Sequence, residues 1–298
     1  MTCGARNNLC QVRPPALHWR PRSCSVYSMK RHRFLNSRKL LLLYGLVLLG
    51  AGGRRMVAEP PAQAVAAFNL YIDGVELRLD RQHRLRDGFL APLAADSQAG
   101  LRRGELMIQQ LTPSNGGELP GALVHHWRGT AFAAGAKAAD FERLMKDFNS
   151  YSRHFSPQVI QAKVVARKDD RMQAVMRVRQ RHVITVVMDT AYDVNFGQLD
   201  AQHGYSVSRS TRISEIDSAG TANERALNAD EEHGFLWRQN TYWSYEERDG
   251  GLYMQIESVS LTRSIPAIIG WAVRPFVESV PRESLEFTMR ATCNALRR

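Results

Sequence analysis

The stretch WRQNTYWSYEERDGGLYMQIESVSLTR, residues 237–263, decides the fold. Two runs rich in aromatic and β-branched residues flank Asp249-Gly250, a combination typical of a tight turn between antiparallel strands. A loop of two or four residues would place Tyr242 directly opposite Glu257, whereas a loop of odd length would put the two side chains on opposite faces. The segment therefore predicts a β-hairpin whose register depends on its turn.

Side chains alternate between the two faces of such a hairpin. The apolar and aromatic face is expected to point into the protein, and it carries Phe235, Trp237, Thr241, Trp243, Tyr245, Met254 and Ile256. The polar face carries Arg238, Asn240, Tyr242, Gln255 and Glu257. Two interpretations of the aromatic face stay open, because large aromatic side chains either fill a core or line a ligand cavity. The cavity set would be Trp237, Trp243, Tyr245 and Ile256.

Further β-rich runs precede the hairpin. Strands are expected at 105–111, 123–133, 159–167, 172–179, 183–196 and 205–216, with a polar loop at 217–233. Two short helices are expected between the second and third of these strands, at 141–148 and 149–155. Apolar residues at spacings of three and four predict another amphipathic helix at 63–86.

The end of the chain, VPRESLEFTMRATCNAL at 280–296, predicts a final amphipathic helix. Pro281 suits its first turn, and Leu285 and Met289 belong to its inward stripe. The preceding segment 267–279 is densely apolar and is interrupted by Pro275. It is interpreted either as a helix packed on the sheet or as a lid that touches a membrane surface.

This order of elements resembles the START-like superfamily, also called SRPBCC, which includes the Bet v 1 allergens and polyketide cyclase-like proteins. The resemblance is to a bacterial branch and covers residues 121–298. It rests on element order, on the hairpin and on the final helix. It implies an α+β helix-grip fold, in which a curved antiparallel sheet wraps around a long C-terminal helix. The helix at 63–86 and the strand at 105–111 lie outside the usual module, in a segment expected to span 56–120.

The resemblance also implies a function. We expect binding or transfer of a hydrophobic or amphipathic, lipid-like small molecule in a cavity between the sheet and the last helix, without catalysis. The expected ligand-binding residues are Trp237, Trp243, Tyr245, Ile256, Arg212, Tyr242, Glu257 and Met289. The alternative is a cyclase, dehydrase or hydrolase type of enzyme that uses acid–base pairs in the cavity, such as Tyr242 with Glu257 or Asp189 with His182.

The basic residues near the hairpin have two interpretations. Arg209 or Arg212 could bind a carboxylate or phosphate of the ligand. The other interpretation is structural, with Arg212 or Arg238 forming an ion pair with Glu257.

The net charge of +11 belongs to the N-terminal arm. Residues 1–55 hold 11 of the 40 Lys and Arg residues and no Asp or Glu, so the remainder carries 29 basic and 29 acidic residues. A neutral domain argues against a nucleic-acid partner. Basic residues after Met29 followed by the apolar run 40–52 are typical of an export signal or of an N-terminal membrane anchor. We therefore expect a periplasmic, secreted or membrane-anchored protein.

Metal and nucleophile motifs are missing from the sequence. The His residues are scattered, and neither HExxH nor CxxC occurs, so no metal and no cofactor are expected. Three of the four cysteines lie in the N-terminal arm, and Cys293 is expected to be a small apolar residue on the last helix.

Overall fold

The computed structural model describes residues 59–113, 116–181, 185–265 and 267–297, and in the last range the side chains are described from Ser279 onward. Residues Met56–Arg298 form one compact unit. Its helices are α2 (Ala62–Gln82), α3 (Ala95–Arg102), α4 (Ala138–Lys146), α5 (Tyr151–His154) and α6 (Ala267–Leu296), with a short 3₁₀ helix η1 (Phe148–Ser150). The apolar run 40–52 and His182 lie outside the described residues. None of the described helices combines the length and the hydrophobicity needed to span a bilayer.

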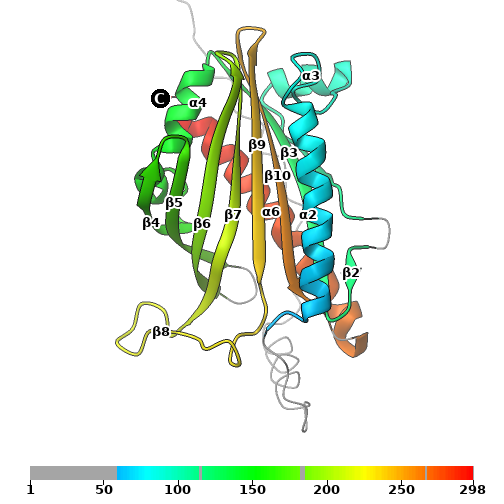
Figure 1. Ribbon diagram of the computed structural model, residues 1–298, viewed down its shortest axis with the longest axis vertical. Helices are drawn as coiled ribbons and strands as arrows, with labels where there is room; N and C mark the ends of the chain where they lie inside the picture. Colours follow the sequence, from blue (N-terminus) through cyan, green and yellow to red (C-terminus); the bar gives the residue numbers. More distant parts are fainter. Residues whose placement is uncertain (1–58, 114–115, 182–184, 266, 298) are drawn as a thin grey trace, which may run out of the picture. The chain divides into compact units, whose positions relative to one another are not determined.

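The strands form one antiparallel sheet in the order β1-β3-β10-β9-β7-β6-β5-β4, with β2 paired to β3 and β8 paired to β7 (Figure 1). Their bounds are β1 Met107–Gln110, β2 Glu118–Leu119, β3 Ala122–Ala134, β4 Val159–Lys168, β5 Arg171–Arg181, β6 Thr185–Asp200, β7 His203–Asp217, β8 Arg225–Ala226, β9 Arg238–Arg248 and β10 Gly251–Arg263. The long strands therefore match those predicted from the sequence, with ends that differ by a few residues. In addition, the loop predicted at 217–233 contains β8, and the segment before β1 contains α3.

The turn between β9 and β10 sets the register of the hairpin. Arg248 pairs with Gly251, so the loop holds two residues. Asp249 and Gly250 have φ angles of 56° and 76°, and two successive positive φ values are the signature of the type I′ turn that matches strand twist. Tyr242 consequently lies opposite Glu257, as predicted for an even-length loop.

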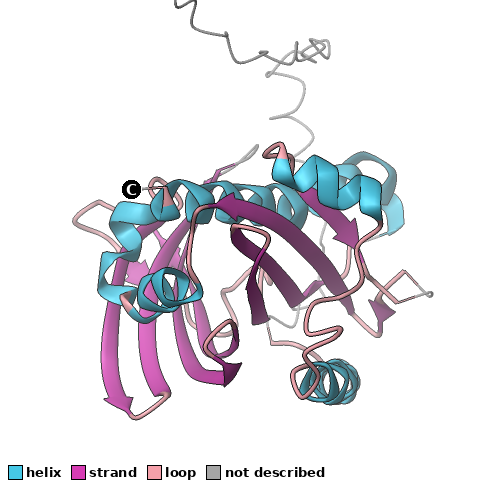
Figure 2. Ribbon diagram, turned by 90° about the horizontal axis from the view of Figure 1, so that it is seen from above, coloured by secondary structure: helices cyan, strands magenta, loops and turns pink. Residues whose placement is uncertain are grey.

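Helix α6 packs against β3 on the inner face of the curved sheet, which confirms the predicted helix-grip fold (Figure 2). The contact is close at Gly129 of β3. A Cβ atom built there would lie 3.1 Å from Cγ of Met289 and 3.2 Å from Cγ of Leu285. Glycine at this position lets the helix approach the strand backbone directly.

The last helix is longer than predicted. The sequence indicated a break at Pro275 and a new helix starting near Pro281, but α6 runs as one element from Ala267 to Leu296. A proline inside a helix removes one backbone donor and usually kinks or breaks it, but α6 continues through both Pro275 and Pro281. The side chains of 267–278 lie outside the described residues, so the lid and packing interpretations of this segment stay predictions.

Helix α2 covers the other face of the sheet (Figure 2). Its buried stripe packs on the outward side chains of the hairpin and of β3, in a cluster with Tyr242, Val259 and Leu261. The stripe consists of Ala64, Phe68, Ile72, Val75 and Leu79. Both faces of the hairpin are therefore largely covered, and Asn240, Tyr242, Gln255 and Glu257 of its polar face are buried.

Candidate functional site

The sheet separates the residues predicted to bind a ligand into two groups. Three hairpin residues and one residue of α6 lie together on the inner face: Trp243, Tyr245, Ile256 and Met289. Trp237 and Tyr242 lie on the outer face, in the cluster under α2. Glu257 also lies there, bonded to Arg78 of α2, and Arg212 is exposed on β7 with its Nε bonded 3.1 Å from Oγ of Ser214.

The predicted position of Trp237 on the inner face is wrong. Strand β9 begins at Arg238, so the alternation that places Trp243 inward does not extend back to Trp237. The backbone N–H of Trp237 donates to the carbonyl oxygen of Leu261 at 2.8 Å, and its ring joins the α2 cluster. The inner positions of Trp243, Tyr245 and Ile256 agree with the prediction.

The inner face is tightly packed at the hairpin. Phe141 of α4 lies over Trp243 and Tyr245, with ring centroids 5.2 Å and 4.8 Å apart. Met289 and Ile256 are almost completely buried. At this end of the interior, the aromatic face of the hairpin forms the core.

The inner face is less completely packed along β4, β5 and β6. Apolar side chains of these strands and of α6 contact the same core but are only half-buried. They are Ala162, Met176, Val178, Phe196, Phe287, Ala291, Ala295 and Leu296. The indole Nε1 of Trp127, in this core, is buried without a hydrogen-bond partner among the described residues. The β4–β6 side of the inner face therefore keeps partly exposed apolar side chains, and the unpaired Trp127 donor belongs to β3 of the same core.

Ionisable groups of the inner core stay neutral at ordinary pH. Burial raises the pKa of the Cys293 thiol and of the Tyr151 and Tyr245 hydroxyls. Cys293 is a buried core residue, in agreement with the prediction. These groups can hydrogen-bond a ligand but are poor bases and nucleophiles.

Of the two predicted acid–base pairs, Tyr242 with Glu257 does not form, and Asp189 with His182 stays a prediction because His182 is not described. Although Tyr242 lies opposite Glu257, its hydroxyl donates to Oε1 of Glu76 at 3.0 Å. Asp189 is held by Arg177, whose Nε lies 2.6 Å from Oδ1, and its proposed partner His182 is outside the described residues. Among the described residues, no group of three or more His, Cys, Asp or Glu side chains is placed to hold a metal ion.

Glu257 forms the centre of a buried ionic network on the outer face. Its Oε1 accepts hydrogen bonds from Nε and Nη2 of Arg128 at 3.0 and 2.7 Å, and its Oε2 accepts from Arg78 and lies 2.9 Å from Nε2 of His126. Burial alone would raise the pKa of Glu257, but the His126 hydrogen bond and the two guanidinium charges outweigh it and hold this pKa far below its usual range. The expected ion pair of Glu257 exists, but with Arg78 and Arg128 in place of Arg212 or Arg238.

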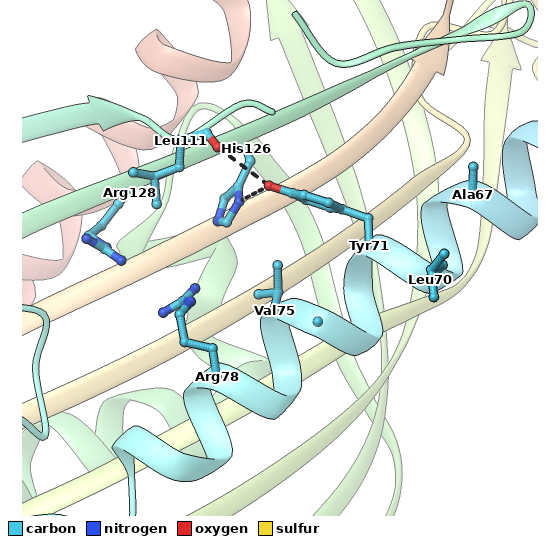
Figure 3. A pocket seen from close by; sticks show the side chains of 9 residues that line it. Ala67, Leu70, Tyr71, Val75, Arg78, Leu111, His126 and Arg128 are labelled. Carbon is cyan, nitrogen blue, oxygen red and sulfur yellow. Dashed lines mark hydrogen bonds between the residues drawn. The ribbon is translucent and has the colours of Figure 1, made fainter. Parts of the chain in front are cut away.

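A groove opens beside this network, between α2 and the strands it covers (Figure 3). Its volume is about 690 Å³, and it is lined by Ala67, Leu70, Tyr71, Gly74, Val75, Arg78, Leu111, His126 and Arg128. The hydroxyl of Tyr71 lies 2.8 Å from Nδ1 of His126. Sequence reasoning missed this groove, because it placed the site on the opposite face of the sheet.

No protein-family model matches the chain, and no curated protein matches it. Several solved structures are similar. A STAR-related lipid transfer protein fragment from Xanthomonas axonopodis is 15% identical, with 64% of this chain and 99% of that one covered and a TM-score of 0.40. Zhui aromatase/cyclase from Streptomyces sp. R1128 is 11% identical, with coverages of 59% and 94% and a TM-score of 0.41. Human STARD10 is 10% identical, with coverages of 72% and 83% and a TM-score of 0.40.

These similarities concern the fold alone. The helix-grip fold predicted from the order of the elements is confirmed by the structure itself, because a curved antiparallel sheet holds the C-terminal helix on its inner face.

Proposed function

We propose that the protein binds a hydrophobic or lipid-like small molecule, without catalysis, in the interior between β4–β6 and α6. The observation that carries the proposal is the set of half-buried apolar side chains on these elements, all in contact with one core. Accessible apolar surface on the concave side of a sheet gains free energy when a ligand covers it.

The chemistry of the interior favours binding over catalysis. The buried thiol of Cys293 and the hydroxyls of Tyr151 and Tyr245 have raised pKa values. General acid–base catalysis needs groups that exchange protons near the working pH. None of these three groups meets that requirement.

The test uses a matched pair of tryptophan substitutions on β5. Val178 is half-buried against the inner core, and Val175, on the same strand, points to the other face and is 39% exposed. Val178→Trp should fill the interior, whereas Val175→Trp should leave it open. Native mass spectrometry of the full-length protein, purified from its own cells, should show a bound apolar molecule on the wild type and on Val175→Trp.

The same adduct should be lost from Val178→Trp. Thermal unfolding of both variants checks that they are folded. A wild type without any adduct would contradict the proposal, and so would a folded Val178→Trp variant that keeps the adduct in full.

The proposal includes a location. Export or anchoring through residues 40–52 would bring the protein to membranes outside the cytoplasm. Contact of the apolar segment 267–279 with a membrane surface would then let a lipid-like molecule enter.

A further inference from the structure

We propose that the groove under α2 is a second site, which binds an amphipathic anion. Arg78 and Arg128 would hold its carboxylate or phosphate head. Its apolar chain would lie along Ala67, Leu70 and Leu111. This site lies on the opposite face of the sheet from the interior binding site and does not depend on it.

The groove carries more positive than negative charge, which favours binding of an anion. Glu257 supplies one carboxylate between the two guanidinium groups of Arg78 and Arg128. In the described part of the chain, Nη1 of Arg128 and both Nε and Nη1 of Arg78 have no protein partner. Figure 3 shows that the two guanidinium groups point toward one another at one end of the groove. Paired guanidinium groups with unused N–H donors suit a carboxylate or a phosphate.

Tyr71 and His126 form the wall of the groove next to Arg78 and Arg128, and a hydrogen bond holds them together. When Nε2–H of His126 donates to Glu257, the Nδ1 atom is left to accept the proton of the Tyr71 hydroxyl at 2.8 Å. Burial, followed by the charge of Glu257, raises the pKa of Tyr71, so the hydroxyl keeps its proton. Because that proton is already used, the donors for an anion come from the two arginines.

Gly74 shows that the groove is open space. It lies in the interior of α2, where glycine is the least favourable residue apart from proline. A Cβ atom built on Gly74 would meet nothing within 4 Å, so packing does not require glycine there. Because Gly74 lines the groove, a larger side chain at this position would occupy it. The volume of about 690 Å³ is within the common range for small-molecule sites, roughly 300–1,000 Å³.

The experiment is isothermal titration calorimetry of the full-length chain with four probes below their micelle-forming concentrations. Dodecyl phosphate and dodecanoate should bind, whereas dodecanol and inorganic phosphate should bind at least about tenfold more weakly, because each lacks either the charge or the chain. Arg78→Gln and Gly74→Phe should each weaken the anionic amphiphiles about tenfold or more. Arg84→Gln removes an exposed charge just beyond α2, where Arg84 pairs with Asp80, and should leave the affinity unchanged.

The Gly74→Phe variant also tests whether a loss of binding comes from a filled groove and not from unfolding of the protein. It replaces a helix-interior glycine without a clash, so its unfolding temperature should equal or exceed that of the wild type. The proposal is overturned if dodecanol binds as tightly as dodecyl phosphate, if inorganic phosphate does so, or if Arg84→Gln has the effect of Arg78→Gln. It is also overturned if Val178→Trp abolishes binding while Gly74→Phe does not, because the amphiphile would then occupy the interior.

Discussion

Acid should destabilise the protein through His83, which lies at the end of α2. The imidazole is buried with 6% of its surface exposed, its Nε2 lies 2.7 Å from Oγ of Ser244, and its ring stacks on Tyr205 at 4.2 Å. Burial lowers the pKa of His83 from 6.5 to about 4. The folded state therefore holds the neutral ring, and protonation favours unfolding.

The size and the direction of the effect follow from this pKa. The stabilisation from neutral His83 is complete above about pH 6.5 and is lost as the pH falls toward 4. The difference between 6.5 and about 4 corresponds to roughly 3 kcal/mol, of which about 2 kcal/mol is lost by about pH 5. Total stabilities of domains are about 5–15 kcal/mol, so this loss is measurable.

The His83→Phe variant isolates this contribution. Phenylalanine keeps a ring against Tyr205 but leaves the Ser244 hydroxyl without its partner, at a cost of about 1 kcal/mol near neutral pH. Urea unfolding, followed by tryptophan fluorescence, should show the wild type more stable near pH 7.5 and the variant more stable near pH 5, by about 1 kcal/mol in each case. The pKa of His125 is also lowered to about 4 by burial, but His125 is present in both proteins and cancels. Parallel pH dependences of the two proteins would refute the reasoning.

Two further predictions concern packing and charge. Gly129→Val should lower the free energy of unfolding by about 1–3 kcal/mol, because its side chain would push Met289 and α6 off the sheet. Gly74→Ala has open space around its Cβ atom and should raise the free energy of unfolding by up to about 1 kcal/mol. If urea unfolding showed the same effect for both variants, the close approach of α6 at Gly129 would be contradicted. Glu257→Gln should cost about 3 kcal/mol, because two guanidinium groups lose their counter-charge. The control, Glu105→Gln, removes an exposed ion pair and should change the free energy of unfolding by less than about 0.5 kcal/mol. If Glu257→Gln and Glu105→Gln cost comparable stability, the Glu257 network would be no stronger than a surface ion pair.

The elements and the position of the hairpin turn could be predicted because their causes are local, whereas the register depended on the loop length that the structure supplies. The sequence placed a tight turn at Asp249-Gly250 and linked an even loop length to the pairing of Tyr242 with Glu257, and the two-residue loop with positive φ angles at both positions gives that pairing. The inner placement of Trp243 and Ile256 followed from alternation within the same strands.

The placement of the polar face could not be predicted in the same way. Alternation states which side chains share a face but not what covers that face. Arg78 and Glu257 are 179 positions apart in the sequence, and only the docking of α2 on the hairpin brings them together. A signal was present in the nearly continuous apolar run of β10 from Leu252 to Ile256, which is typical of a strand buried on both faces. This run indicated that a second element covers the outer face of β10, and the amphipathic helix predicted at 63–86 was available to do so.

The ionic network on the outer face also favours the strand register that positions the side chains of the inner face. Ile256 and Glu257 are neighbours in β10, one in the apolar core under α6 and the other between two arginines under α2. A slip of one residue would exchange their positions, because side chains alternate. The carboxylate would then be buried without a partner among apolar groups, at a cost of several kcal/mol, and Arg128 would lose its counter-charge. The network therefore stabilises one register over its nearest alternative, whatever its net contribution to the folded state. Since the same register aligns Trp243 and Ile256 with α6, the chemistry of the groove and the shape of the interior are set by one strand pairing.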